Sequence, residues 1–277
     1  MLPAISLLLA LAPVQFEGET TFDALHKAAY EADISYKPMP ERMEFFARRL
    51  LGKPYVGWTL ERDENQEFCF VSMDRLDCVT FAETVLGLAN VRWNSRALVS
   101  SDNLVRAVEE TRYRGGRVDG YLSRLHYTSD WIYDNARKGT VIDLTKSLPG
   151  AKPFVKTINF MSQHMSVYRQ LIAHPELVDT LKAQEATITA RPKWFVPKDA
   201  VVGAEAQFQS GDIIAITDSR PGMDCAHVGL IIVEKGIPHF VHASSLQKKT
   251  IFDVRLSEFL AKTKSHTGIM VARPRDR

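Results

Sequence analysis

A chain of 277 residues with 45% hydrophobic and 25% charged residues has the composition of an ordinary globular protein, with material for one large domain or two small ones. Its formal net charge of +2 gives no case for nucleic-acid binding. No basic run with interleaved aromatic residues occurs either, so we expect no nucleic-acid partner.

The first twelve residues are predicted to be a signal peptide. Met1 to Ala12 contains an apolar core that ends in Ala10-x-Ala12, a pattern typical of a cleavage site. We therefore expect export, to the periplasm or out of the cell, and a single domain over residues 13–277. The alternative is a short buried N-terminal segment. This run is too short to span a bilayer and no later one is long enough, so we expect no transmembrane segment.

Helices are predicted through most of the first two thirds of the chain. Residues 41–51 carry apolar side chains at the spacing of an amphipathic helix, which Gly52 ends. Asp77 is a good N-cap residue, so a helix is predicted to begin at Cys78. Apolar residues cover most of that helix, and we expect it to run through the core. Further helices are predicted over 102–112, 160–172 and 176–189, with turns or loops over 113–149 and 191–209.

Strands are predicted in the last third of the chain, which makes the fold class α+β, with N-terminal helices packed on an antiparallel sheet. A turn centred between Lys235 and Gly236 would pair His242 opposite Gly229, on the sheet face that carries His227. Diagonal neighbours of this kind lie roughly 7–8 Å apart at Cα, and long side chains bridge that distance. A register slip of one residue would place His242 on the other face. The predicted strands are 213–217, 227–233, 240–242, 250–254 and 269–272, with a short helix around Leu256 and Leu260.

Cys78 and the two histidines form the arrangement that a cysteine hydrolase needs. The nucleophile of such an enzyme is the thiolate, and both a helix N-terminus and an adjacent imidazolium lower the pKa of a thiol. We expect Cys78 to be ionised in this way, with His227 as the base and His242 orienting its ring. A free N–H group in the first turn of the helix could receive the oxyanion of a tetrahedral intermediate.

Other roles are open to the same residues. A lone buried cysteine is usually a small apolar residue, and a lone histidine in a strand is usually structural. A zinc site of Cys78, His227 and His242 would lack the C-x-x-C or H-E-x-x-H pattern that such sites favour, so we expect no metal and no cofactor. Cys69 and Cys225 could pair in a disulfide or be plain core thiols. Only Cys78 opens a helix.

Three short segments of the chain resemble papain-like bacterial cell-wall hydrolases of the NlpC type. Leu76-Asp77-Cys78-Val79-Thr80-Phe81 is similar to the nucleophile motif Asp-Cys-Ser-Gly-Phe of that group, and His227-Val228-Gly229 is similar to its strand-borne histidine. Gly52-Lys53-Pro54-Tyr55 resembles a Gly-x-Pro-Tyr element whose tyrosine lies beside the nucleophile. The resemblance implies a papain-like fold, and it implies that Tyr55 assists Cys78 at the oxyanion.

Longer segments from about residue 41 to residue 273 resemble the N-acetylmuramoyl-L-alanine amidase-like family. They include residues 113–135, 159–162, 211–214 and 242–245. This resemblance implies peptidoglycan or its muropeptide fragments as the substrate. It leaves two bonds open, the lactyl–L-alanine amide and the D-glutamyl–diaminopimelate bond of the peptide stem.

Residues 94–209 separate Cys78 from His227 by far more chain than compact NlpC-type domains have. We expect a helical and loop insertion that packs around the cleft and contributes substrate-binding residues. Arginine suits the carboxylates of a muramyl peptide, and aromatic rings suit a sugar face. The alternative for each candidate is a buried hydrogen-bond network. The candidates are Arg124, His126, Tyr127, Asp130 and Trp131.

The leading hypothesis from the sequence is a cysteine amidohydrolase that acts through a thioester acyl-enzyme. Cys78 would attack an amide carbonyl, and His227 would take the thiol proton and pass one to the leaving amine. The same residues would serve acyl transfer if an amine replaced water. A third hypothesis is a non-catalytic wall-binding module on a degenerate hydrolase fold.

Overall fold

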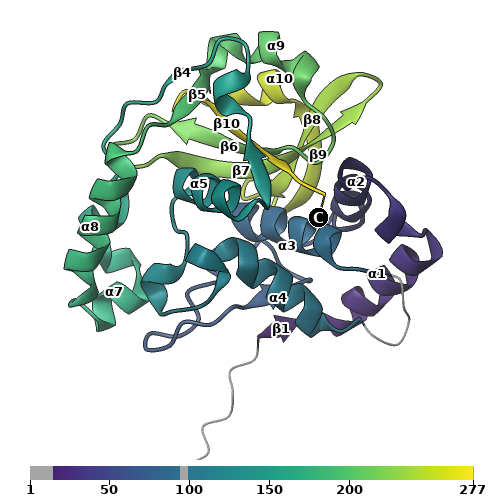
Figure 1. Cartoon of the computed structure of the whole chain (residues 1–277), viewed down its shortest axis with the longest axis horizontal. Coiled ribbons are helices and arrows are strands. Elements are labelled where there is room, and N and C mark those ends of the chain that lie inside the picture. The colour runs from purple at the N-terminus through teal and green to yellow at the C-terminus, as the bar shows by residue number, and fades with distance from the viewer. Residues whose placement is uncertain (1–14, 94–98, 277) are drawn as a thin grey trace, which may run out of the picture.

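An antiparallel sheet of eight strands divides the molecule into two layers of helices (Figure 1). The computed structural model describes residues 15–93 and 99–276, so the predicted signal peptide lies outside the described residues. Helices α2, α3, α4 and α5 lie on one side of the sheet, and α9 and α10 lie on the other. The chain is therefore a mixed α+β structure with helices packed on an antiparallel sheet.

Seven strands of the sheet follow the order β4-β5-β10-β6-β7-β8-β9, and β3 pairs with β10 outside that path. A separate parallel pair joins β1 to β2. The strands are β1 (Phe16–Glu17), β2 (Val71–Ser72), β3 (Val141–Asp143), β4 (Lys152–Pro153), β5 (Trp194–Pro197), β6 (Ile213–Asp218), β7 (Cys225–Glu234), β8 (Ile237–Ser244), β9 (Lys249–Arg255) and β10 (His266–Pro274).

The helices vary from one turn to nearly four turns. Those longer than ten residues precede β3, except for α8. The helices are α1 (Glu19–Glu31), α2 (Met39–Arg49), α3 (Cys78–Asn90), α4 (Ser101–Arg112), α5 (Thr128–Lys138), α6 (Phe160–Gln163), α7 (Arg169–Ala173), α8 (Leu177–Ala190), α9 (Val201–Ala204) and α10 (Leu256–Ala261).

The β7–β8 hairpin has the predicted register. Lys235 and Gly236 form a two-residue turn, with φ of 52° and 79°, and Glu234 pairs with Ile237. Two consecutive positive φ values give a turn whose twist matches that of the flanking strands. The ladder continues to Leu230 opposite Val241. The next position therefore sets Gly229 against His242, as predicted.

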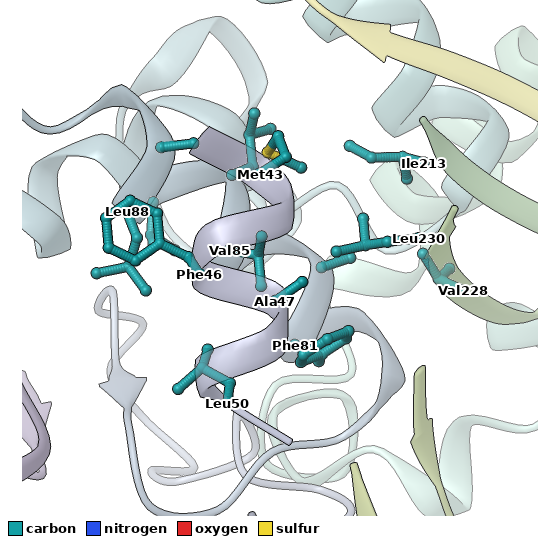
Figure 2. Packing of buried hydrophobic residues seen from close by; sticks show 14 of the residues in the cluster. Met43, Phe46, Ala47, Leu50, Phe81, Val85, Leu88, Ile213, Val228 and Leu230 are labelled. Carbon is teal, nitrogen blue, oxygen red and sulfur yellow. The ribbon is translucent and has the colours of Figure 1, made fainter. Parts of the chain in front are cut away.

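The two faces of the sheet have different cores. Val228 and Leu230 of β7 point to the side of α2 and α3, where they pack with Phe81 and Val85 of α3 (Figure 2). The alternate residue of β7, Ile231, belongs to a second cluster beneath α10. Gly229 lies on that second face too. A Cβ atom added there would lie 2.5 Å from the ring of Phe240, so the glycine permits the ring to pack.

Several predicted elements agree with the structure and others need correction. The helices that begin at Cys78 and near residues 41, 102 and 176 are present, and so are the five predicted strands. Residues 113–149, predicted to be turns, contain α5, whose buried face includes Ser129, Asp130 and Asn135. Only Trp131 and Ile132 of its buried residues are apolar, and they are adjacent in the sequence, so they give no helical apolar periodicity. Helix α1 was not predicted at all.

The predicted helix over residues 160–172 is broken in the structure. Helix α6 ends before His164, which has φ −130° and ψ 38°, and α7 begins at Arg169. The His164 ring bonds the Phe160 carbonyl at 2.8 Å, a side-chain bond that competes with helix continuation.

The insertion is not only helical and loop. It supplies β3, β4 and β5, and both β3 and β5 pair with β10. Residues 191–209, predicted to be loop, thus hold β5 and α9. Both β3 and β5 pair with β10, which lies about 70 to 130 positions further along the chain. No local sequence pattern therefore predicts these two strands.

All three cysteines are free thiols in the structure. Cys69 is buried, while Cys78 and Cys225 are partly exposed. Of the two predictions for Cys69 and Cys225, the structure favours separate thiols over a disulfide. Within residues 15–93 and 99–276, no helix is both long enough and apolar enough to cross a bilayer.

Candidate active site

Cys78 is the first residue of α3, and a reciprocal cap holds that end of the helix. The Thr80 N–H donates to Asp77 Oδ1 at 2.8 Å, and the Asp77 N–H donates to Thr80 Oγ1 at 2.8 Å. This capping box satisfies two groups that a helix start would otherwise leave free. It fixes the first turn and with it the direction of the Cys78 side chain.

Backbone N–H groups surround the sulfur of Cys78. Those of Val79 and Val228 donate to it, together with the N–H of Cys78 itself. These bonds favour a thiolate, yet burial, together with the neighbouring charge of Asp77, raises the pKa of Cys78 to about 12. The prediction that the resting sulfur is ionised is therefore wrong in direction, because desolvation outweighs the helix N-terminus.

His227 and His242 are joined by a direct hydrogen bond. His227 Nε2 lies 2.7 Å from His242 Nδ1, and His242 Nε2 lies 3.4 Å from Asp253 Oδ2. The three residues come from β7, β8 and β9, so the hairpin register brings them into line. His242 is buried, while His227 and Asp253 are partly exposed.

Asp253 did not emerge from the sequence. Ile251 pairs with His242, so Asp253 is its diagonal neighbour on β9. A register shift between the pairs at His239 and Val241 interrupts the ladder here. No local pattern in Thr250-Ile251-Phe252-Asp253 marks the aspartate, which becomes recognisable only when the β8–β9 pairing is known.

Both histidines are neutral at rest. Burial lowers the pKa of His227 to about 3, and the charges of His242 and His266 act in the same direction. Burial also lowers the pKa of His242, which the bond to Asp253 opposes. For Asp253, burial acts upward, but the bonds from Val254 and His242 hold its pKa below the ordinary value. The aspartate is therefore a charged acceptor.

The hydrogen-bond roles in this row follow from that charge. A carboxylate only accepts, so His242 Nε2 must carry a proton. A neutral His242 then has an accepting Nδ1, so the partner atom, His227 Nε2, must donate. The remaining nitrogen of His227, Nδ1, holds a free lone pair. The row of residues thus prepares one ring atom to take up a proton.

Cys78 lies beside the backbone of His227. The Val228 nitrogen that donates to the sulfur is covalently joined to the His227 carbonyl carbon. The structure thus brings the sulfur to the backbone at the start of β7, while the His227 ring packs against Phe240 and Phe259.

Tyr55 is held close to the same sulfur. Its N–H donates to the Lys248 carbonyl at 2.9 Å, and it forms a parallel bridge with Leu76, two residues before Cys78. Burial, with smaller contributions from the neighbouring Cys78 and Asp77, raises the pKa of Tyr55 to about 12. The phenol therefore stays protonated and can donate a hydrogen bond.

Two cavities border these residues. A cleft of about 620 Å³ is lined by His227 and His242, with Arg220, Asp253, Phe259 and Lys262 around it. A much smaller recess of about 40 Å³ lies on the α3 side. The recess is lined by Val79, Ala82, Glu83, Leu125, His126, Thr128, Trp131, Ile213 and Val228.

The five predicted substrate-binding residues divide into two groups. His126 and Trp131 line the recess beside α3. Arg124 pairs instead with Glu61 and lies 3.5 Å from Glu67.

Tyr127 and Asp130 have protein partners as well. The Tyr127 hydroxyl donates to Glu185 at 2.6 Å, and Asp130 bonds Arg114 and Arg191 at 2.7 Å each. For Arg124, Tyr127 and Asp130 these contacts favour the alternative of a buried network.

The described part of the chain holds no group of three or more His, Cys, Asp or Glu residues placed to bind a metal ion. Burial raises the pKa of Cys69 to about 12 and that of Cys225 well above its ordinary value. The pKa therefore does not single out Cys78 among the thiols. Its place at a capped helix start, with N–H donors from two elements, does.

Comparison with known proteins gives one family and several solved structures. The model of the N-acetylmuramoyl-L-alanine amidase-like family matches residues 45–269. An N-acetylmuramoyl-L-alanine amidase from Bacteroides uniformis is 33% identical with a TM-score of 0.77, over 86% of this chain and 99% of that one. No match was found among curated proteins.

Two further structures are similar. A proposed xylanase from Bacteroides fragilis is 34% identical with a TM-score of 0.73, over 82% of this chain and 98% of that one. A Legionella pneumophila protein, 21% identical over 93% of this chain and 96% of its own, has a TM-score of 0.66 and supports the fold alone.

Proposed function

The chain belongs to the N-acetylmuramoyl-L-alanine amidase-like family, and from this premise we propose that it is a cysteine amidohydrolase of peptidoglycan or soluble muropeptides. The bond we assign first is the lactyl–L-alanine amide. The observation that carries the proposal is the row Asp253–His242–His227, which leaves His227 Nδ1 able to accept a proton, together with the N–H of Val228, the residue after His227, which donates to the Cys78 sulfur. We also propose a place among the papain-like NlpC-type hydrolases, on the motifs around Cys78 and His227.

The reaction begins with neutral partners. His227 Nδ1 takes the proton of Cys78, so a thiolate and an imidazolium form together, and the thiolate then attacks the amide carbonyl. Attraction between the two charges then offsets the desolvation cost of burying them. A single buried ion in this place would have no such compensation. His242 and Asp253 hold the ring in its tautomer and stabilise the positive charge.

The tetrahedral intermediate places a negative oxygen near the start of α3. N–H groups of the first turn and the protonated Tyr55 hydroxyl are the donors we assign to it. The C–N bond then breaks, and the imidazolium gives its proton to the leaving amine. A thioester on Cys78 remains, and water, deprotonated by His227, hydrolyses it to a free carboxylate.

The competing assignment within this class is the D-glutamyl–diaminopimelate bond, and the competing class is a non-catalytic wall-binding module. The row that leaves His227 Nδ1 able to accept a proton, and the partly exposed thiol of Cys78 at a capped helix start, favour an enzyme over a binding module. On the apolar run of residues 1–12 we further propose export to the periplasm or beyond.

The test is digestion of purified peptidoglycan and of isolated muropeptides, with product masses read by mass spectrometry. Release of intact L-alanyl stem peptides is expected, and Cys78→Ala should lower the rate by about 10⁴-fold or more. Cys225→Ala, a second partly exposed thiol, is the matched control and should keep the activity. Products that begin at diaminopimelate would show that the enzyme cuts the D-glutamyl–diaminopimelate bond instead. If Cys78→Ala were as active as the wild type, the proposal of a cysteine hydrolase would be refuted.

A further inference from the structure

The recess beside α3 is built around the same two residues that meet the sulfur. Val79 and Val228 donate their N–H groups to Cys78 and also contribute side chains to the wall of the recess. A group that enters the recess therefore contacts Val79 of α3 and Val228 of β7, the two residues whose N–H groups donate to the Cys78 sulfur. Leu125 and Trp131, from the insertion, close the other side.

The volume of the recess limits what it can hold. A cavity needs roughly 10–15 Å³ of such space for one water molecule, so about 40 Å³ accommodates a methyl group or a slightly larger aliphatic branch. A sugar ring, a glutamyl chain or a diaminopimelyl chain is too large. Most of the wall is aliphatic or aromatic, so an apolar branch is favoured over a polar one.

The position of His227 decides which half of the substrate enters the recess. His227 must reach the leaving nitrogen to protonate it, and His227 lines the 620 Å³ cleft. The leaving amine and its peptide therefore belong on the cleft side. The acyl group, held on the sulfur, belongs on the side of Val79 and Val228, where the recess lies.

We propose that this recess is a specificity pocket for a methyl branch on the carbon next to the scissile carbonyl, which in muramic acid is the lactyl methyl. This inference rests on the proposed function. The carbon next to the scissile carbonyl of a γ-D-glutamyl group is an unbranched methylene and would leave the recess empty. The recess thus selects the lactyl–L-alanine amide over the bond within the stem.

The test compares two substrates that differ by this methyl alone. N-acetylmuramoyl-L-alanyl-D-isoglutamine carries the lactyl group, and its normuramoyl analogue carries a glycolyl group instead. One methyl in an apolar pocket is worth about 10- to 200-fold in kcat/KM, so the wild type should prefer the muramoyl compound by at least about 10-fold. The ratio is measured on one sample, so the fraction of active protein cancels.

Two variants of Leu125 change the size of the recess. Leu125→Phe should fill it and bring the ratio of the two substrates close to one. Leu125→Val should widen it and raise the relative rate of an ethyl-branched analogue, a gain that a poorly folded protein does not produce. Ile172→Phe, the same kind of enlargement at an exposed position of α7, should keep the wild-type ratio.

The outcomes separate the two proposals. If the wild type cleaves both compounds at rates within about twofold of each other, the pocket is refuted and the amidase remains. The pocket is refuted as well if Leu125→Phe keeps the wild-type preference. If the wild type cleaves neither compound, the proposed bond is wrong and the pocket falls with it.

Discussion

Two buried polar networks lie within this molecule, and they differ in how their charges are balanced. Around Arg124, the guanidinium meets Glu61 and Glu67, and every charge has an opposite charge beside it. In the row Asp253–His242–His227 one carboxylate meets two neutral rings, and the last ring atom has no partner within the row. The first arrangement pairs each charge with an opposite one, whereas the second has a proton position left to fill.

This difference separates polar residues that hold the fold from those able to do chemistry. Arg124, with 5% of its side chain exposed, and Glu67, with 3%, are too enclosed to reach a ligand. His227 and Cys78 are partly exposed at the start of β7 and α3. The contacts of polar side chains in the insertion favour a role in stability, and those at the hairpin are the ones we propose to take part in the reaction.

The largest effect is expected on stability, from breaking the charge cluster of Arg124, Glu61 and Glu67. Arg124→Met leaves Glu61 and Glu67 buried without a counter-charge, which should cost about 3–5 kcal/mol of the free energy of unfolding. Urea denaturation measures this, and KM of the remaining folded protein should stay unchanged. Arg106→Met, at an exposed position of α4, is the control. A raised KM with normal stability would instead make Arg124 a substrate-binding residue.

A smaller effect is expected at the far end of the hairpin row. In Asp253→Asn, the side chain no longer favours a proton on His242 Nε2. That tautomer of His242 is the one that leaves Nδ1 of His227 unprotonated. We expect kcat to fall about 10- to 100-fold, with KM and the melting temperature nearly unchanged. Asp179→Asn, an exposed aspartate of α8, should have no effect on kcat. If Asp253→Asn lowered the melting temperature and kept kcat, Asp253 would belong with the stabilising network.

The smallest effect is expected from acid. The pKa of His227 is about 3 in the folded protein and about 6.5 in the unfolded chain, so between these pH values the unfolded chain binds the extra proton. Stability should therefore fall as the pH drops below about 6.5. His227→Gln should reduce the loss of unfolding free energy between pH 7 and pH 5 by on the order of 1 kcal/mol. Identical pH dependence of the two proteins in urea denaturation would show that the ring is not held neutral.

The parts of the site predicted from the sequence depend on local geometry. Asp77 caps a helix whatever the rest of the chain does, and Lys235-Gly236 forms a two-residue turn that fixes where His242 falls. These two short segments placed Cys78, His227 and His242 on their elements. The class of fold followed from the same periodicities.

The parts that escaped prediction depend on contacts between distant residues. Strand β5 exists because β10 pairs with it, and most of the buried residues of α5 are polar, so neither element shows in a local pattern. Asp253 joins His242 only through a β8–β9 pairing that shifts register. The neutral state of Cys78 results from burial, and a motif carries no information about burial.

The brevity of the β7–β8 turn has a consequence for comparing genomes. Fifteen positions separate His227 from His242, and with a two-residue turn nearly all of them belong to the paired strands. One inserted or deleted residue in this stretch would rotate one imidazole to the opposite side of the sheet. The number of residues between these two histidines can therefore serve to distinguish related genes that keep the row Asp253–His242–His227 from genes that have lost it.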